Sequence, residues 1–81
     1  MKLGTIESAG EMITTIVKMM VDNPDEVVVT ATVYDRSVTY GVHVSHLDRR
    51  KLIGRDERSL RVLLQSISLP QKLEIKLHIE D

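Results

Sequence analysis

The sequence has 81 residues, of which 42% are hydrophobic and 28% charged, with a formal net charge of −1. A chain of this length is too short for two separate hydrophobic cores, so residues 1–81 are predicted to form a single domain. The absence of cysteine excludes a disulfide scaffold, a thiolate zinc site and a cysteine nucleophile. It is compatible with a reducing cytosol, and we predict a cytoplasmic protein.

Apolar residues recur at helical spacing from residue 5 to about residue 22, which predicts an amphipathic helix. No unbroken apolar run approaches ~18 residues, so we expect neither a membrane span nor a signal peptide. Met12, Met19 and Met20 are interpreted as core-filling side chains. The stretch NPDE at 23–26 ends the helix, because proline cannot continue the hydrogen-bond ladder.

Two β-branched stretches, 27–34 and 37–44, predict an antiparallel hairpin with one buried face. Asp35 and Arg36 form the predicted turn between them, which is not of the favoured Asn-Gly type. The side chains predicted to face inward are Val27, Val29, Ala31 and Val33 on the first strand and Val38, Tyr40, Val42 and Val44 on the second.

A short helix, HLDRRKLI, is predicted to follow, with Ser45 and Asp48 as a weaker form of the capping box. Gly54 suits a left-handed position just past the end of that helix. Asp56 or Glu57 then favours the N-terminus of a third helix, which SLPQ at 68–71 closes. The third helix is predicted from apolar residues at helical spacing, namely Leu60, Leu63, Leu64 and Ile67.

The last stretch, KLEIKLHIE at 72–80, alternates strictly and predicts a strand with Leu73, Ile75, Leu77 and Ile79 facing inward. The order of elements is therefore α-β-β-α-α-β. It predicts an α+β fold in two layers, a three-stranded mixed sheet with three helices on one face. The helical connection between the second and third strands favours a parallel, right-handed crossover.

Positive charge is concentrated between residues 49 and 61, where six cations stand against two acids for a local net of +4. The rest of the chain therefore carries −5. Such a cluster is typical of a surface that binds phosphates. The plainer interpretation is that helix surfaces often carry arginine, and the charge alone does not decide between the two.

Several stretches resemble the small bacterial single-domain type II KH RNA-binding proteins, the KhpA-like family. VDNPDEVVV is similar to that family's VDHPEDV, and DRSVTYGVHV to its ERTVVYELRV. KLIGRDERSLRVLLQSI resembles its hairpin KVIGKQGRIAKAIRTLV. The resemblance covers nearly the whole chain and implies a type II KH fold.

The resemblance implies binding of short single-stranded RNA, with a G-x-x-G loop against the phosphates and bases in an aliphatic groove. Carried onto this sequence, it gives an RNA-binding set of Arg49, Arg50, Lys51, Ile53, Gly54, Arg55, Asp56, Glu57, Arg58 and Arg61. The loop is degenerate, because Glu57 replaces the second glycine. Asp56 and Glu57 are expected to cancel the charge of Arg55 and Arg58, so weak or non-specific binding is predicted.

The alternative prediction is a KH-fold protein-interaction module that has lost most RNA binding. The resemblance implies a homodimer or pairing with a larger KH protein of the Jag type as its partner. An enzyme is not predicted, and neither is a metal or a cofactor. The histidines are interpreted as surface residues, Asp25 and Glu26 as a solvated turn, and Ser45 as a helix cap.

Overall fold

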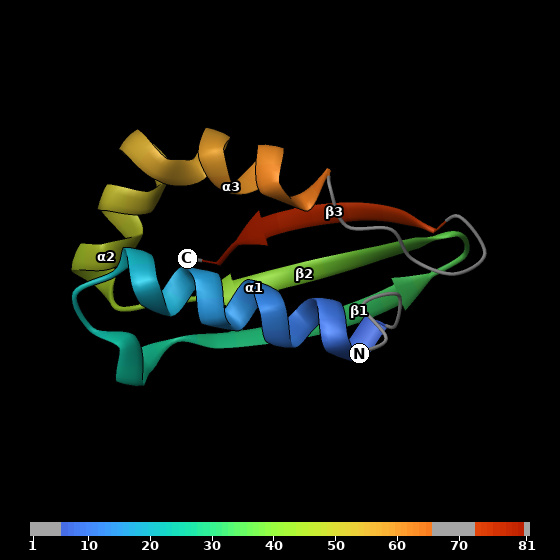
Figure 1. Cartoon of the computed structure of the whole chain (residues 1–81), viewed down its shortest axis with the longest axis horizontal. Coiled ribbons are helices and arrows are strands. Elements are labelled where there is room, and N and C mark those ends of the chain that lie inside the picture. Colours follow the sequence, from blue (N-terminus) through green and yellow to red (C-terminus); the bar gives the residue numbers. More distant parts are fainter. Residues whose placement is uncertain (1–5, 66–72, 81) are drawn as a thin grey trace.

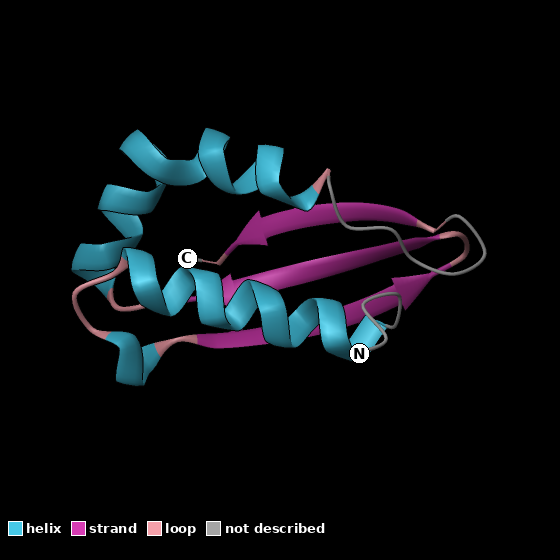
Figure 2. Ribbon diagram, viewed as in Figure 1, coloured by secondary structure: helices cyan, strands magenta, loops and turns pink. Residues whose placement is uncertain are grey.

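The computed structural model describes residues 6–65 and 73–80. Figure 1 shows the chain order, and Figure 2 distinguishes the helices from the strands by colour. The elements are α1 (Ile6–Met20), a 3₁₀ turn η1 (Pro24–Glu26), β1 (Val28–Tyr34), β2 (Ser37–His43), α2 (His46–Lys51), a π-helical segment η2 (Leu52–Asp56), α3 (Glu57–Leu64) and β3 (Glu74–Ile79).

The three strands form one mixed sheet in the order β1-β2-β3. β1 and β2 are antiparallel and pair without a break from Val28↔His43 to Tyr34↔Ser37. β3 runs parallel to β2, with Tyr40 opposite Leu77. The predicted hairpin and the predicted parallel crossover are both confirmed, and the fold is α+β with helices on one face of the sheet (Figure 1).

The two-residue turn of the hairpin uses a backbone conformation that few side chains adopt. Asp35 has φ of 55°, which aspartate tolerates better than most non-glycine residues. The Ser37 hydroxyl donates a 3.0 Å hydrogen bond to the Tyr34 carbonyl oxygen across the turn. A polar turn without Asn-Gly therefore still closes a two-residue hairpin.

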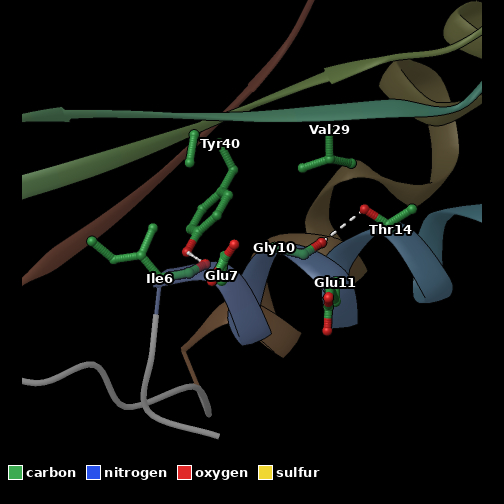
Figure 3. Close-up of a pocket in the computed structure, with 8 residues that line it drawn as sticks. Ile6, Glu7, Gly10, Glu11, Thr14, Val29 and Tyr40 are labelled. Atoms are coloured by element: carbon green, nitrogen blue, oxygen red, sulfur yellow. Dashed lines mark hydrogen bonds between the residues drawn. The ribbon is translucent and has the colours of Figure 1, made fainter.

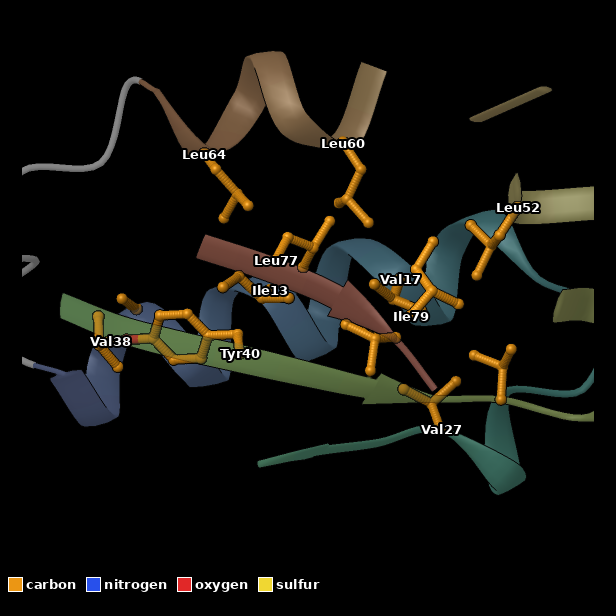
Figure 4. Packing of buried hydrophobic residues seen from close by; sticks show 13 residues of the cluster. Ile13, Val17, Val27, Val38, Tyr40, Leu52, Leu60, Leu64, Leu77 and Ile79 are labelled. Carbon is orange, nitrogen blue, oxygen red and sulfur yellow. The ribbon is translucent and has the colours of Figure 1, made fainter. Parts of the chain in front are cut away.

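The core lies between the inner face of the sheet and two helices (Figure 4). Its buried apolar side chains are Ala9, Ile13 and Val17 from α1, Val38, Tyr40 and Val42 from β2, Leu60 and Leu64 from α3, and Leu77 and Ile79 from β3, with Val27, Val44 and Leu52 beside them. The inward faces predicted from alternation in β2 and β3 are thus confirmed. Of the inward face predicted for the first strand, Val27 is buried and Val29 packs against the core, but Ala31 is exposed and Val33 is 53% exposed. Ile67 and residues 68–71 lie outside the described residues.

One methionine of α1 does not lie where the sequence predicted. Met19 is 80% exposed, so its assignment to the core is wrong, whereas Met20 packs against the buried cluster. Position 19 lies two residues from buried Val17, which places it on the far side of an α-helix. In the described part of the chain, no helix is long and apolar enough to cross a membrane.

Candidate nucleic-acid interface

The N-terminus of helix α2 is held in place by a buried carboxylate. The Ser45 hydroxyl caps the helix by accepting a 3.2 Å hydrogen bond from the Asp48 amide, and it donates a 2.9 Å bond to Asp48 Oδ2. Asp48 is only 2% exposed and also accepts the amides of Asp22 (3.1 Å) and Asn23 (2.9 Å). The predicted cap is confirmed, and the same carboxylate joins α2 to the end of α1.

The environment of Asp48 has opposing effects on its acidity. Burial raises the pKa of the carboxyl group, and hydrogen bonds from the Asp22 amide, the Ser45 hydroxyl and Asn23 lower it. The hydrogen bonds outweigh burial, so the pKa lies below its ordinary value. Asp48 is therefore held as a carboxylate, and its negative charge is stabilised by hydrogen bonds within the fold.

From His46 to Leu64 the chain is helical without interruption, through α2, η2 and α3. We call these residues, 46–64, the basic arm. The predicted loop at Gly54 is absent, because Leu52 and Glu57 both have right-handed helical dihedrals and no described glycine has a positive φ. The left-handed assignment of Gly54 is wrong.

The π-helical segment accounts for the difference. One wider turn at Leu52–Asp56 changes the direction of the helix between α2 and α3 without a break in helical structure (Figure 1). A Cβ added at Gly54 would meet nothing within 4 Å, so no packing contact within the protein requires glycine there. Sequence reasoning assigned the bend to a glycine turn, whereas the structure assigns it to a π-helix.

Continuous helix changes how this region can contact a phosphate. α3 begins at Glu57 directly after η2, so the amides of its first turn do not form a free helix N-terminus. A glycine-rich loop would instead present unpaired backbone N–H groups. In this conformation, binding of a phosphate depends on side chains rather than on a backbone cradle.

Of the six cations in the predicted RNA-binding set, three have partners within the protein. Arg49 Nε donates a 3.0 Å hydrogen bond to the Glu80 carbonyl oxygen. Lys51 Nζ lies 3.5 Å from Asp22 Oδ2, and Arg61 Nη2 lies 3.7 Å from Glu57 Oε1 one turn earlier. These three side chains help to hold the arm against the rest of the fold or against itself.

The other three cations are Arg50, Arg55 and Arg58. All three are exposed, and none forms an ion pair with a described side chain. Glu57 forms its ion pair with Arg61, and the expectation that Asp56 and Glu57 cancel the charge of Arg55 and Arg58 stays a prediction. The Asp56 side chain lies outside what the structure describes.

Large apolar side chains also reach the surface of the basic arm. Ile53, predicted for the groove, is 42% exposed, and Leu63, predicted to face inward, is 44% exposed. Leu47 and Val62 are 71% and 58% exposed, and sequence reasoning missed both. Their exposure could have been predicted from the sequence. Both residues are apolar, but neither lies at the helical spacing that connects the buried residues. The arm thus combines cations with an apolar surface.

The residues considered for catalysis or metal binding do not come together. His43 and His78 are exposed on β2 and β3, and His46 begins α2. Among the described residues, no group of three histidine, aspartate or glutamate side chains could hold a metal ion. Ser45 is occupied by its capping hydrogen bonds.

Comparison with known proteins identifies relatives of matching length. RNA-binding protein KhpA of Listeria monocytogenes serovar 1/2a is 36% identical over 72 residues, which cover 85% of this chain and 95% of the relative. The protein of the same name from Listeria innocua serovar 6a gives the same figures. KhpA of Caldanaerobacter subterraneus subsp. tengcongensis is 33% identical over 73 residues, or 86% and 97% of the two chains.

No protein-family model matches the chain, and no solved structure does. The alignments with the curated relatives nevertheless extend over nearly the full length of both partners. The chain belongs to the KhpA family of RNA-binding proteins.

Proposed function

We propose that the protein binds short single-stranded RNA along the basic arm, weakly and with little sequence preference. Its relatives are named RNA-binding proteins, and the proposed surface is the one part of the chain where positive charge is concentrated. We further propose that residues 1–81 act as one domain, in the cytoplasm, in binding rather than in catalysis.

The observation that carries this proposal is the exposure of Arg50, Arg55 and Arg58 without acidic partners among the described residues. Arginine binds phosphate oxygens through a planar fork of donors, and such contacts release counterions from the nucleic acid. Exposed Ile53 beside them offers an apolar surface for a base. Arg49, Lys51 and Arg61 have internal partners and are proposed to contribute less.

Two features of the arm support weak binding. The helix at Gly54–Glu57 leaves no backbone cradle for a phosphate, so each contact is made by a flexible side chain that must be ordered. Asp56 and Glu57 also place negative charge in the same segment. With only Tyr34 and Tyr40 as aromatic residues, strong base stacking is not expected.

The test is titration of the protein into a fluorescein-labelled short oligouridylate, followed by anisotropy at several salt concentrations. Three phosphate contacts predict a slope of log affinity against log salt of roughly −2, at about 0.7 per contact on a single strand. Arg55→Gln and Arg58→Gln should each weaken binding and reduce the slope by about 0.7. Arg36→Gln, in the hairpin turn, removes the same charge and should change neither value.

A salt-independent affinity, or equal losses from Arg36→Gln and Arg55→Gln, would count against this surface. Glu57→Gly is a further variant, because it removes one acid and restores the glycine of the related loop. If wild type does not bind RNA and Glu57→Gly does, the protein has the fold of an RNA binder without its activity.

That outcome would favour a second function, as a protein-interaction module that forms a homodimer or pairs with a larger KH protein of the Jag type. The observation in its favour is the set of exposed apolar side chains on the arm, Leu47, Ile53, Val62 and Leu63. Exposed apolar groups of this size mark contact surfaces when they lie together. Sedimentation of wild type and Val62→Glu tests it, since only an apolar contact would be broken by the added charge.

A further inference from the structure

β1 forms an open edge of the sheet. It pairs with β2 on one side, and in the described part of the chain no strand pairs with its other side. Facing residues of an antiparallel pair alternate between bonded and non-bonded positions. Alternate residues of β1 therefore direct their N–H and C=O groups away from β2, into a row available to another strand.

This edge lacks the features that usually protect an open strand. Its sequence, Val-Val-Thr-Ala-Thr-Val-Tyr, contains no charged residue and no proline. The pairing with β2 is continuous over all its residues, so no bulge twists the edge away. Val28 and Val33 are 53% exposed and Tyr34 is 81% exposed. A neutral, β-branched edge of this length favours pairing with a further strand.

Beside the edge, on the helical side of the sheet, lies a hollow of about 370 Å³ (Figure 3). It is lined by Ile6, Glu7, Gly10, Glu11 and Thr14 of α1, Val29 and Ala31 of β1, and Tyr40 of β2. Glu7 and Glu11 are exposed one helical turn apart, whereas Val29 and Ala31 give the strand side an apolar character. The hollow thus has an apolar wall and an acidic rim.

We propose that the β1 edge binds an extended basic segment of a partner protein as a fourth strand. Main-chain hydrogen bonds to β1 supply the pairing, as in other cases of strand addition. Every second side chain of the added strand points to the helical face. A lysine or arginine there lays its aliphatic stem against Ala31 and brings its charged head to Glu7 and Glu11.

Charge complementarity distinguishes this partner from a second copy of the chain. If two copies paired through β1, neither strand would bring a cation to the hollow, because β1 has none. The two acidic rims would also lie on the same face of the joined sheet, where like charges repel. A strand that alternates basic and apolar residues can form hydrogen bonds with the β1 edge and also place its cations beside the acidic rim of the hollow.

The proposed docking edge is separate from the basic arm. β1 is the outermost strand on one side of the sheet, and α3 lies beside β3 at the other side (Figure 1). The inference therefore does not rest on RNA binding, and both ligands can be bound at once.

The experiment uses the full chain and the labelled peptide acetyl-Thr-Arg-Val-Lys-Val-Arg-Thr-amide, with anisotropy as the binding measurement. A peptide with glutamate at the basic positions is the control ligand and should not bind. Glu7→Gln with Glu11→Gln should weaken binding of the basic peptide roughly three- to thirtyfold. Glu74→Gln, an exposed acid on β3, should leave the affinity unchanged.

Pairing with the edge itself has separate readouts. Bound peptide should slow hydrogen exchange of β1 amides and leave β3 amides unchanged. Ala31→Arg places a cation of the protein's own in the hollow and should abolish peptide binding, whereas Ala31→Thr, a favourable strand residue, should preserve it. Equal binding of the glutamate peptide would overturn the proposal. So would a concentration-dependent dimer that Ala31→Arg removes, because the edge would then belong to a second copy.

Discussion

The Tyr40 hydroxyl donates a 2.7 Å hydrogen bond to the Ile6 carbonyl oxygen, which joins the central strand to the first turn of α1 (Figure 3). Tyr40 is fully buried, and its ring packs against Gly10 of the same helix. Burial raises the pKa of the phenol, so the neutral, hydrogen-bonding form is the one that the fold favours. One side chain thus sets how closely the helix approaches the sheet.

Tyr40→Phe should therefore lower the free energy of unfolding by about 0.5–1.5 kcal/mol, because the Ile6 carbonyl loses its partner while the packing of the ring is kept. Urea unfolding followed by circular dichroism measures this difference. Tyr34→Phe is the matched control, since Tyr34 is 81% exposed on the open edge of the sheet. Equal effects of the two substitutions would show that the hydrogen bond to Ile6 is not what distinguishes Tyr40.

Acid should destabilise the protein through Asp48. The pKa of this carboxyl group is lowered in the folded state, so its ionised form stabilises the fold fully above the ordinary pKa of 3.8. That contribution is lost as pH falls through the lowered folded pKa. Urea midpoints measured at decreasing pH should show a steeper acid loss in wild type than in Asp48→Asn.

At neutral pH, Asp48→Asn should itself be destabilising, because an amide offers one acceptor oxygen where the carboxylate oxygens accept bonds from both Asp22 and Asn23. Asp25→Asn, on the exposed η1 turn, makes the same chemical change outside this network. An acid profile that Asp25→Asn flattens as much as Asp48→Asn would remove Asp48 from the explanation.

Much of the fold could be predicted from local patterns. Alternation in β2 and β3 gave the buried face because only one face of this sheet is covered, which makes period-two hydrophobicity unambiguous. Ser45 and Asp48 gave the start of α2 because capping depends on residues three positions apart. Exposed Val28 and Val33 were not foreseen as edge residues, since a β-branched sequence does not reveal whether a strand has one neighbour or two.

The candidate site was less predictable, for two physical reasons. A glycine between helical patterns indicates a turn, yet glycine also occupies ordinary helical dihedrals, and the π-helix at Leu52–Asp56 uses the second option. Charges close in sequence suggested that Glu57 would neutralise Arg58, whereas helical geometry pairs it with Arg61 four residues on. Sequence neighbours and helical neighbours are different sets.

Gly54→Ala separates a structural role from a binding role. Alanine should stabilise the protein by up to about 1 kcal/mol, because Gly54 has helical dihedrals and an added Cβ meets no atom within 4 Å. Gly10→Ala should give no such gain, since its Cβ would lie 3.3 Å from the pinned ring of Tyr40. Thermal unfolding of the two variants tests the contrast.

RNA binding by the Gly54→Ala variant tests whether a phosphate contacts the backbone at position 54. If a phosphate approaches the backbone at Gly54, the stabilised Gly54→Ala protein should bind the oligouridylate more weakly than wild type. If arginine side chains alone make the contacts, as the continuous helix indicates, the affinity should be retained. A Gly54→Ala protein that is less stable than wild type would show that this position leaves helical dihedrals in solution.

The ion pair between Glu57 and Arg61 yields the last prediction. The two groups are 3.7 Å apart on the surface of α3, so the pair contributes only about 0.3–0.5 kcal/mol to stability. Glu57→Gln should therefore change the unfolding midpoint little, and it should release Arg61 for a phosphate while removing a repulsive charge. We expect a several-fold higher RNA affinity at low salt and a salt slope steeper by about 0.7.

Glu57→Gln with Arg61→Gln should return the slope to the wild-type value, because the cation that Glu57 restrains is then absent. A slope that stays steeper than the wild-type value without Arg61 would contradict the release of Arg61, whereas any gain in affinity that remains measures the repulsion between Glu57 and RNA.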